Sequence, residues 1–257
     1  MSTPSHRLKL QRADEHLADI DRLTEPLRER REYPVVETMK PYKKGPLWDY
    51  VLDLDEVQPP ERLPILMGDY LFNVRSALDH LAVALAPRKY RRKVSFPIHQ
   101  TDPLARDHTS GYYLNAEAAS RWLALCDRLP DNCIAPLMAL QPYQAAALHG
   151  HRAEHHALVL LGGFQNADKH RELIDAPVGL SKAEVEVNGE TSYAVPTFQN
   201  GTRVVFDAPE KVDVKVKGVA VVGIKRGNDV WSFDMLVDRL SAFIADELLP
   251  RLEPLIQ

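Results

Sequence analysis

Apolar residues recur at intervals of three and four in several long stretches of the chain, which is the period of an amphipathic helix. These stretches cover about residues 6–31, 62–86, 115–129, 151–173 and 232–255. Asn115 is suited to cap the third stretch. Pro87 and Pro130 end the second and third because proline cannot continue the helical hydrogen bonds. We therefore expect five long helices.

Two other regions alternate between apolar and polar residues, which is the period of a half-buried strand. Residues 33–39 and 48–54 flank a turn at 43–46 and predict an N-terminal β-hairpin. From 183 to 225 valines alternate with polar residues, and Asn188-Gly189, Asn200-Gly201 and Gly227-Asn228 provide turns. Because strands and helices do not alternate along the chain, we expect an α+β fold rather than a parallel sheet.

The order of these elements predicts a helical core at about 58–175, a C-terminal antiparallel β portion at about 183–230 and a closing helix at about 232–255. No linker isolates the β-rich part, so we expect residues 1–257 to form a single domain.

Composition narrows the class of protein. The chain has 257 residues, of which 45% are hydrophobic, enough to bury a substantial core. Its formal charge of −4 means that any binding to nucleic acid must come from a local patch. The two cysteines are too few for a disulfide framework. Neither a secretory signal nor a run of about 18 apolar residues occurs, so we expect a cytoplasmic protein without membrane contact.

The stretch GDYLFNVRSALDHLAVALA at 68–86 combines a complete apolar stripe with an unusual set of polar residues. Asp69, Asn73, Ser76 and His80 form one row along the helix, and Arg75 and Asp79 form an i,i+4 pair beside it. Such residues serve either as a solvated face, as a buried network that fixes helix packing, or as a functional site.

The stretch LGGFQNADKHREL at 161–173 repeats this combination with Asn166, Asp168, Lys169, His170 and Arg171. Gly162 and Gly163 are tolerated in a helix where another backbone approaches closely. A crossing at Gly162 would bring Asn166 and His170 toward the polar row of the first helix. We therefore expect the two helices to share a site.

Arg75 and His80 resemble the arginine, four-residue spacer, histidine motif of the HEPN superfamily of helical nucleases and nucleotide-binding proteins. The resemblance implies RNA cleavage without a metal, in which His80 exchanges a proton and Arg75 holds the phosphate. Asp79, Asn73, Asn166 and His170 would then position the substrate or the catalytic pair. Ser76 departs from the motif, which commonly has Asn, Asp or His after the arginine. Because Arg75 and His80 point about 140° apart on one helix, joint action needs a helix end, a bend or a homodimer.

A basic cluster follows this helix. It consists of Arg88, Lys89, Tyr90, Arg91, Arg92 and Lys93. Such a patch can hold an RNA backbone while the ring stacks on a base, or it can be a solvated loop.

Two further hypotheses remain open. His149, His151, His155 and His156 crowd one segment, and His151 and His155 have the i,i+4 spacing of zinc ligands on a helix, so a metal-dependent enzyme is one alternative. No other metal or cofactor motif accompanies them, and we expect no cofactor. In the second alternative the polar helix faces are structural, with Asp168, Lys169 and Arg171 in ion pairs, and the protein binds a ligand or partner without catalysis.

Four sequence strings resemble those of an uncharacterised family of bacterial and phage proteins. They are G-D-x-x-x-N-x-R-S-A-L-D-H-L at 68–81, F-P-I at 96–98, L-x-P-Y-Q at 140–144 and N-x-D-K-H-R at 166–171. The resemblance covers most of the chain and implies that the two polar-loaded helices are the family's signature. It implies no activity.

Overall fold

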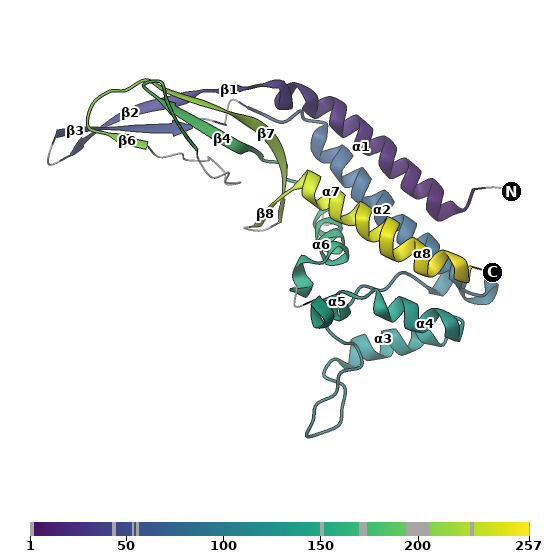
Figure 1. Cartoon of the computed structure of the whole chain (residues 1–257). Helices are drawn as coiled ribbons and strands as arrows, with labels where there is room; N and C mark the ends of the chain where they lie inside the picture. Colours follow the sequence, from purple (N-terminus) through teal and green to yellow (C-terminus); the bar gives the residue numbers. More distant parts are fainter. Residues whose placement is uncertain are drawn as a thin grey trace. The chain divides into compact units, whose positions relative to one another are not determined.

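The computed structural model describes residues 3–42, 45–52, 54, 57–149, 152–169, 174–193, 206–226 and 229–256. Helices and antiparallel sheets are segregated along the chain, which confirms the α+β prediction (Figure 1). The chain divides into two compact units. The first comprises Met1–His16, Gly68–Glu172 and Leu236–Gln257, and the second comprises Leu17–Met67 and Leu173–Met235. The expectation of a single domain stays a prediction.

The helical elements follow the predicted stretches, with additional short pieces between them. They are α1 (Ser5–Glu29), α2 (Leu63–Leu85), the 3-10 helix η1 (Arg88–Lys93), α3 (Ala116–Cys126), α4 (Asp131–Ala139), α5 (Pro142–His149), the 3-10 helix η2 (Ala153–His155), α6 (Ala157–Lys169), α7 (Phe233–Ala242), the π-helix η3 (Phe243–Leu248), α8 (Leu249–Leu252) and the 3-10 helix η4 (Glu253–Leu255).

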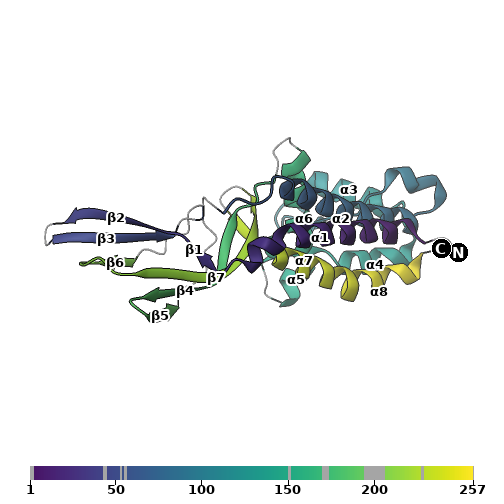
Figure 2. The same ribbon diagram turned by 90° about the horizontal axis from the view of Figure 1, so that it is seen from above.

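In the first unit, the start of α1, the body of α2 and the α7–α8 stretch run alongside one another in both ribbon views (Figures 1 and 2). The apolar stripe of α2 is buried as its periodicity predicts, with Leu71, Leu78 and Leu81 each 1% exposed. Each such leucine contributes roughly 2 kcal/mol to stability by leaving water. The two ends of the described chain also meet, since His6 Nε2 lies 2.7 Å from Glu253 Oε1 and Arg7 pairs with the same carboxylate.

Two predicted helices differ from the structure. Instead of one helix over 151–173, residues 142–149 form α5 and α6 begins only at Ala157, because His156 has an extended backbone with φ −68° and ψ 140°. The closing helix contains the π-helix η3, which Pro250 follows. Pro250 is the second residue of α8, in the first turn of that helix, where proline is tolerated.

The second unit contains the strands β1 (Glu32–Tyr33), β2 (Val35–Tyr42), β3 (Gly45–Leu52), β4 (Val178–Val187), β5 (Glu190–Tyr193), β6 (Phe206–Ala208), β7 (Val214–Arg226) and β8 (Asp229–Ser232). The predicted hairpin β2–β3 is confirmed and pairs with β6, while the other sheet has the order β1-β7-β4-β5 with β8 beside β7. The turn from β4 to β5 places Asn188 and Gly189 at φ of +49° and +86°, as the Asn-Gly pair predicts. The other two predicted turn pairs lie outside the described residues.

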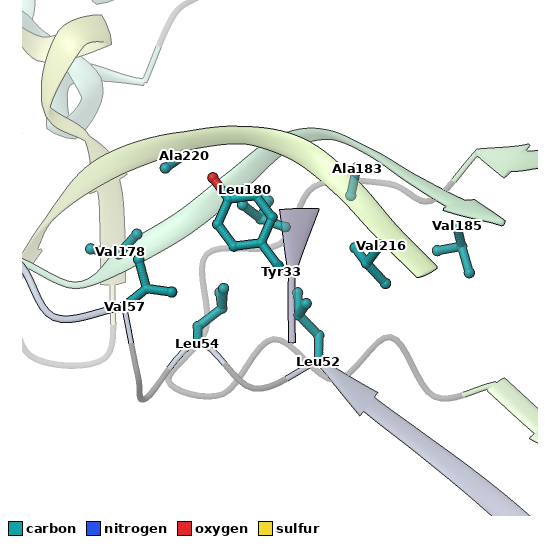
Figure 3. Close-up of a cluster of buried hydrophobic side chains, with 10 residues drawn as sticks. All are labelled: Tyr33, Leu52, Leu54, Val57, Val178, Leu180, Ala183, Val185, Val216 and Ala220. Atoms are coloured by element: carbon teal, nitrogen blue, oxygen red, sulfur yellow. The ribbon is translucent and has the colours of Figure 1, made fainter. Parts of the chain in front are cut away.

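The core of the second unit is formed by the apolar residues that alternate along its strands. Figure 3 shows Tyr33 at the centre, with Leu180 and Ala220 on one side of the ring and Leu52 and Leu54 on the other. Val185 of β4 lies directly opposite Val216 of β7 in the register, and both are buried. Cross-strand pairs of this kind stabilise a sheet.

Candidate functional site

Arg75 and Asp79 of α2 form hydrogen bonds to the backbone of Phe96. The Arg75 Nη2 donates to Asp79 Oδ1 at 3.0 Å and to the Phe96 carbonyl at 2.8 Å, and the Phe96 N–H donates to the same Asp79 oxygen at 2.9 Å. The Arg75 side chain is 17% exposed and Phe96 is buried. The predicted i,i+4 ion pair of Arg75 and Asp79 therefore forms, and its hydrogen bonds to Phe96 hold the F-P-I segment against α2.

The L-x-P-Y-Q string holds the next residue of the same segment. The His99 N–H donates to Gln141 Oε1 at 3.0 Å, and the Tyr143 N–H donates to the His99 carbonyl at 3.3 Å. Gln141 is 0% exposed, and its Nε2 donates to the Leu137 carbonyl at 3.0 Å. A buried amide with both ends bonded fixes the segment without an unsatisfied polar group.

Gly162 of α6 faces a side chain of this segment. A Cβ atom at Gly162 would meet the Ile98 Cδ1 at 3.8 Å, an ordinary van der Waals contact, and no backbone among the described residues comes within 4 Å. The close backbone crossing expected at Gly162 is therefore wrong. Phe96 is thus bonded to α2, and the side chain of Ile98 faces Gly162 of α6.

Two side chains of the polar row, Asn73 and His80, form contacts within α2 and with α1. Asn73 is buried, and its Nδ2 donates to the carbonyl of Asp69 at 2.8 Å. His80 Nδ1 lies 3.0 Å from the Ser5 Oγ at the start of α1. Because α2 is uninterrupted and Arg75 is turned to Phe96, the structure does not bring Arg75 and His80 together.

The predicted residues of the shared site that follow Gly163 lie outside the described side chains. Asn166, Asp168 and Lys169 belong to α6, but their side chains lie outside the described part of the chain, as do His170 and Arg171 entirely. The shared site of the two helices stays a prediction.

Of the predicted metal ligands, the structure describes the side chains of His155 and His156. His155 lies in η2 and His156 in the extended residue before α6, so the helical i,i+4 spacing predicted for His155 is wrong. His151 lies outside the described residues, and so does the side chain of His149. Within the described ranges, no three His, Cys, Asp or Glu side chains gather closely enough to hold a metal ion.

A cavity of about 450 Å³, which we call the basic pocket, lies between the 93–99 segment and α3. Its charged lining residues are Lys93, Arg121 and Arg128, and neither Asp nor Glu lines it. Arg128 Nη1 donates to the Lys93 carbonyl at 2.7 Å, which joins the two walls. Arg121 also pairs with Glu117, but both side chains are largely exposed, so water screens this ion pair.

His99 completes the basic pocket. Its ring stands edge-on to Trp122, with centroids 5.5 Å apart. Burial lowers the pKa of His99 from its ordinary value of 6.5, and the nearby Asp102 opposes this shift. The imidazole is therefore neutral at pH 7 and can donate or accept a hydrogen bond in the pocket.

The basic cluster predicted from the sequence forms η1, and Lys93 belongs to both η1 and the basic pocket. None of its residues is buried. Lys89 Nζ lies 4.6 Å from the centre of the Tyr90 ring, and Arg91 Nε donates to the Ala86 carbonyl. Among the residues that the structure describes, no cation of η1 has an acidic partner within ion-pair distance.

Arg121, Arg128 and His99 were missed by sequence reasoning. His99 lies more than 20 residues from the two arginines in the chain, and the three residues form no motif; only the fold places α3 opposite the 93–99 segment. The absence of acidic residues from 88 to 101 was a signal that could have extended the cluster toward His99.

Comparisons of the chain with protein-family models, with curated proteins and with solved structures found no match. Among the helices that the structure describes, none has both the length and the apolar character needed to cross a bilayer.

Proposed function

We propose that the protein binds single-stranded RNA through η1 and the basic pocket. The observation that carries this proposal is a cavity whose three charged lining residues are all cations and which shares Lys93 with a turn of five cations. Cations without acidic partners attract phosphates, and binding releases the counterions of the nucleic acid. The cations of η1 extend past the cavity, which favours a chain of phosphates over a single small anion.

A single strand fits this surface better than a duplex. The basic pocket is concave and can receive an unstacked base, and the half-buried Tyr90 lies in η1 three residues before the lining residue Lys93. Lys89 covers one face of the Tyr90 ring, so a base would stack on the other face. Neutral His99 adds a hydrogen-bonding group that can contact a base edge.

Binding without cleavage is the form of the proposal that the contacts support. Cleavage by Arg75, Asp79 and His80 would require the Arg75 guanidinium to leave the carbonyl of the buried residue Phe96. Metal-independent cleavage in the manner of the HEPN superfamily remains an alternative. The experiment below distinguishes the two.

The test is fluorescence anisotropy with a labelled single-stranded oligouridylate over a series of salt concentrations, in the presence of a chelator. For the Arg88→Gln/Arg92→Gln variant we expect weaker binding and a salt slope reduced by about 1.4, because each phosphate contact contributes about 0.7 on a single strand. The matched control is Arg22→Gln/Lys215→Gln, which removes the same charge from exposed positions of the second unit. Its affinity and slope should equal those of the wild type.

Three results would contradict the proposal. The first is the absence of wild-type binding at low salt, and the second is an equal loss of affinity in both double variants. The third is shortening of the RNA on a denaturing gel that disappears in His80→Ala, which would establish the cleavage alternative instead.

A further inference from the structure

A second cavity, of about 420 Å³, lies elsewhere in the first unit and shares no lining residue with the basic pocket. Residues of α5, η2, the start of α6, α7 and η3 line it, and we call it the π-turn pocket. Cavities of this size hold small molecules. Its apolar lining consists largely of alanines together with Pro142 and Phe243.

The π-helix η3 forms part of the wall of this pocket. Phe243, Asp246 and Glu247 all come from η3 and all line the cavity. Single π-turns inside α-helices are rare and are frequent at functional sites, because the extra residue changes where side chains point. The π-turn is therefore an observation, independent of the cavity itself, that points to a ligand at this place.

Charges of both signs line the π-turn pocket, and some of them are already paired. Arg152 pairs with Glu154 at 3.4 Å, and Glu247 pairs with Arg251 at 3.5 Å. Two lining charges remain. Among the described residues, Arg239 has the neutral carbonyl of His155 as its partner, at 3.3 Å, and no acidic one. Asp246 has no ion-pair or hydrogen-bond partner among the described residues.

His156 adds a neutral donor to the same wall. Its Nδ1 lies 3.2 Å from the Leu158 N–H and accepts a hydrogen bond from it, so the proton of the ring is on Nε2. The ring packs edge-on against Phe243, with centroids 5.0 Å apart. Burial lowers the pKa of His156 to about 4, so the ring is uncharged at pH 7.

We propose that the π-turn pocket binds a short zwitterionic peptide of two or three residues. The carboxylate of the peptide would lie at Arg239, within reach of the His156 Nε2–H, and its ammonium group at Asp246. Arg239 of α7 and Asp246 of η3 are seven residues apart, which is at most about 10 Å along the helix axis because the π-turn is shorter per residue than an α-helix. A tripeptide spans about 10 Å when extended, whereas one amino acid separates its charges by much less. The alanines and Phe243 would contact the apolar middle of the peptide.

The test is isothermal titration calorimetry of the full chain with the tripeptide Ala-Phe-Ala, its N-acetyl form and its C-terminal amide. We expect the free tripeptide to bind and each blocked form to bind about tenfold more weakly, because each lacks one charge-assisted contact. Asp246→Asn should weaken binding of the free tripeptide about tenfold and leave the already weaker binding of the N-acetyl form unchanged. Arg239→Gln should likewise weaken binding of the free tripeptide about tenfold and leave binding of the C-terminal amide unchanged.

Asp238→Asn is the matched control, since this exposed residue of α7 does not line the pocket. It should bind all three peptides as the wild type does. Three results would each overturn the proposal: no heat of binding from the free tripeptide, equal affinity for free and blocked forms, or an equal loss for free and N-acetyl peptide in Asp246→Asn. Thermal melts of each variant verify that it is folded.

Discussion

Two sets of charged side chains meet the 93–99 segment and are used in different ways. Arg75 and Asp79 bond each other and both backbone polar groups of Phe96. Lys93, Arg121 and Arg128 line a cavity whose lining has no acidic residue; Arg128 bonds the Lys93 carbonyl, and Arg121 pairs with Glu117 only at an exposed position that water screens. A charged pair with satisfied partners positions the chain, whereas cations whose charge is not neutralised in the pocket are available to a ligand. The polar pair of α2 thus holds one wall of the pocket that we propose binds RNA.

The largest loss of stability is expected from a substitution of Gln141, which is fully buried and bonded at both ends of its amide. Gln141→Ala leaves the His99 N–H and the Leu137 carbonyl without these partners and opens a cavity. We expect a loss of about 3 kcal/mol in the free energy of unfolding, measured by urea denaturation. The control, Gln100→Ala, changes an exposed neighbour and should cost less than about 0.5 kcal/mol. Equal stability of the two variants would show that the segment is not held by Gln141.

A somewhat smaller effect is expected at Asp79. Asp79→Ala removes the acceptor of two hydrogen bonds, but the carboxylate is partly exposed and water can replace it in part. We expect a loss of about 2 kcal/mol, seen as a melting temperature lower by roughly 6 °C. Asp69→Ala is the matched control on the same helix, because Asn73 bonds its backbone carbonyl and not its carboxylate. A wild-type melting curve for Asp79→Ala would contradict the positioning role.

The smallest effect concerns pH and the basic pocket. Because the pKa of His99 is lowered from 6.5, its ring is neutral at pH 7 and gains a positive charge only when the pH falls below its lowered pKa. RNA affinity should therefore rise at acidic pH, by roughly twofold to threefold for one added cation near a phosphate. Anisotropy titrations from pH 7.5 downward measure this change. In His99→Phe the rise should disappear; a rise that persists in this variant would place the titrating group elsewhere.

The sequence predicted the α+β class, the N-terminal hairpin and the buried stripe of α2, because each rests on local periodicity. It also identified Arg75 with Asp79 and the cations of η1. It did not predict that Arg75 turns to Phe96, since this contact joins residues 21 positions apart in the chain. For the same reason it missed the pocket between α3 and the 93–99 segment. The break before α6 was missed because the apolar spacing continues through His156, whose extended backbone interrupts the helix.

The salt dependence of RNA binding by Arg75→Gln, compared with Arg128→Gln, tests most directly whether Arg75 positions the wall or contacts phosphate. Both variants lose one positive charge from the same unit. The account predicts that Arg128→Gln lowers the slope of log affinity against log salt by about 0.7, while Arg75→Gln leaves the slope unchanged and lowers only the melting temperature. A slope reduced equally in Arg75→Gln would mean that Arg75 binds phosphate and would contradict the division between positioning and binding residues.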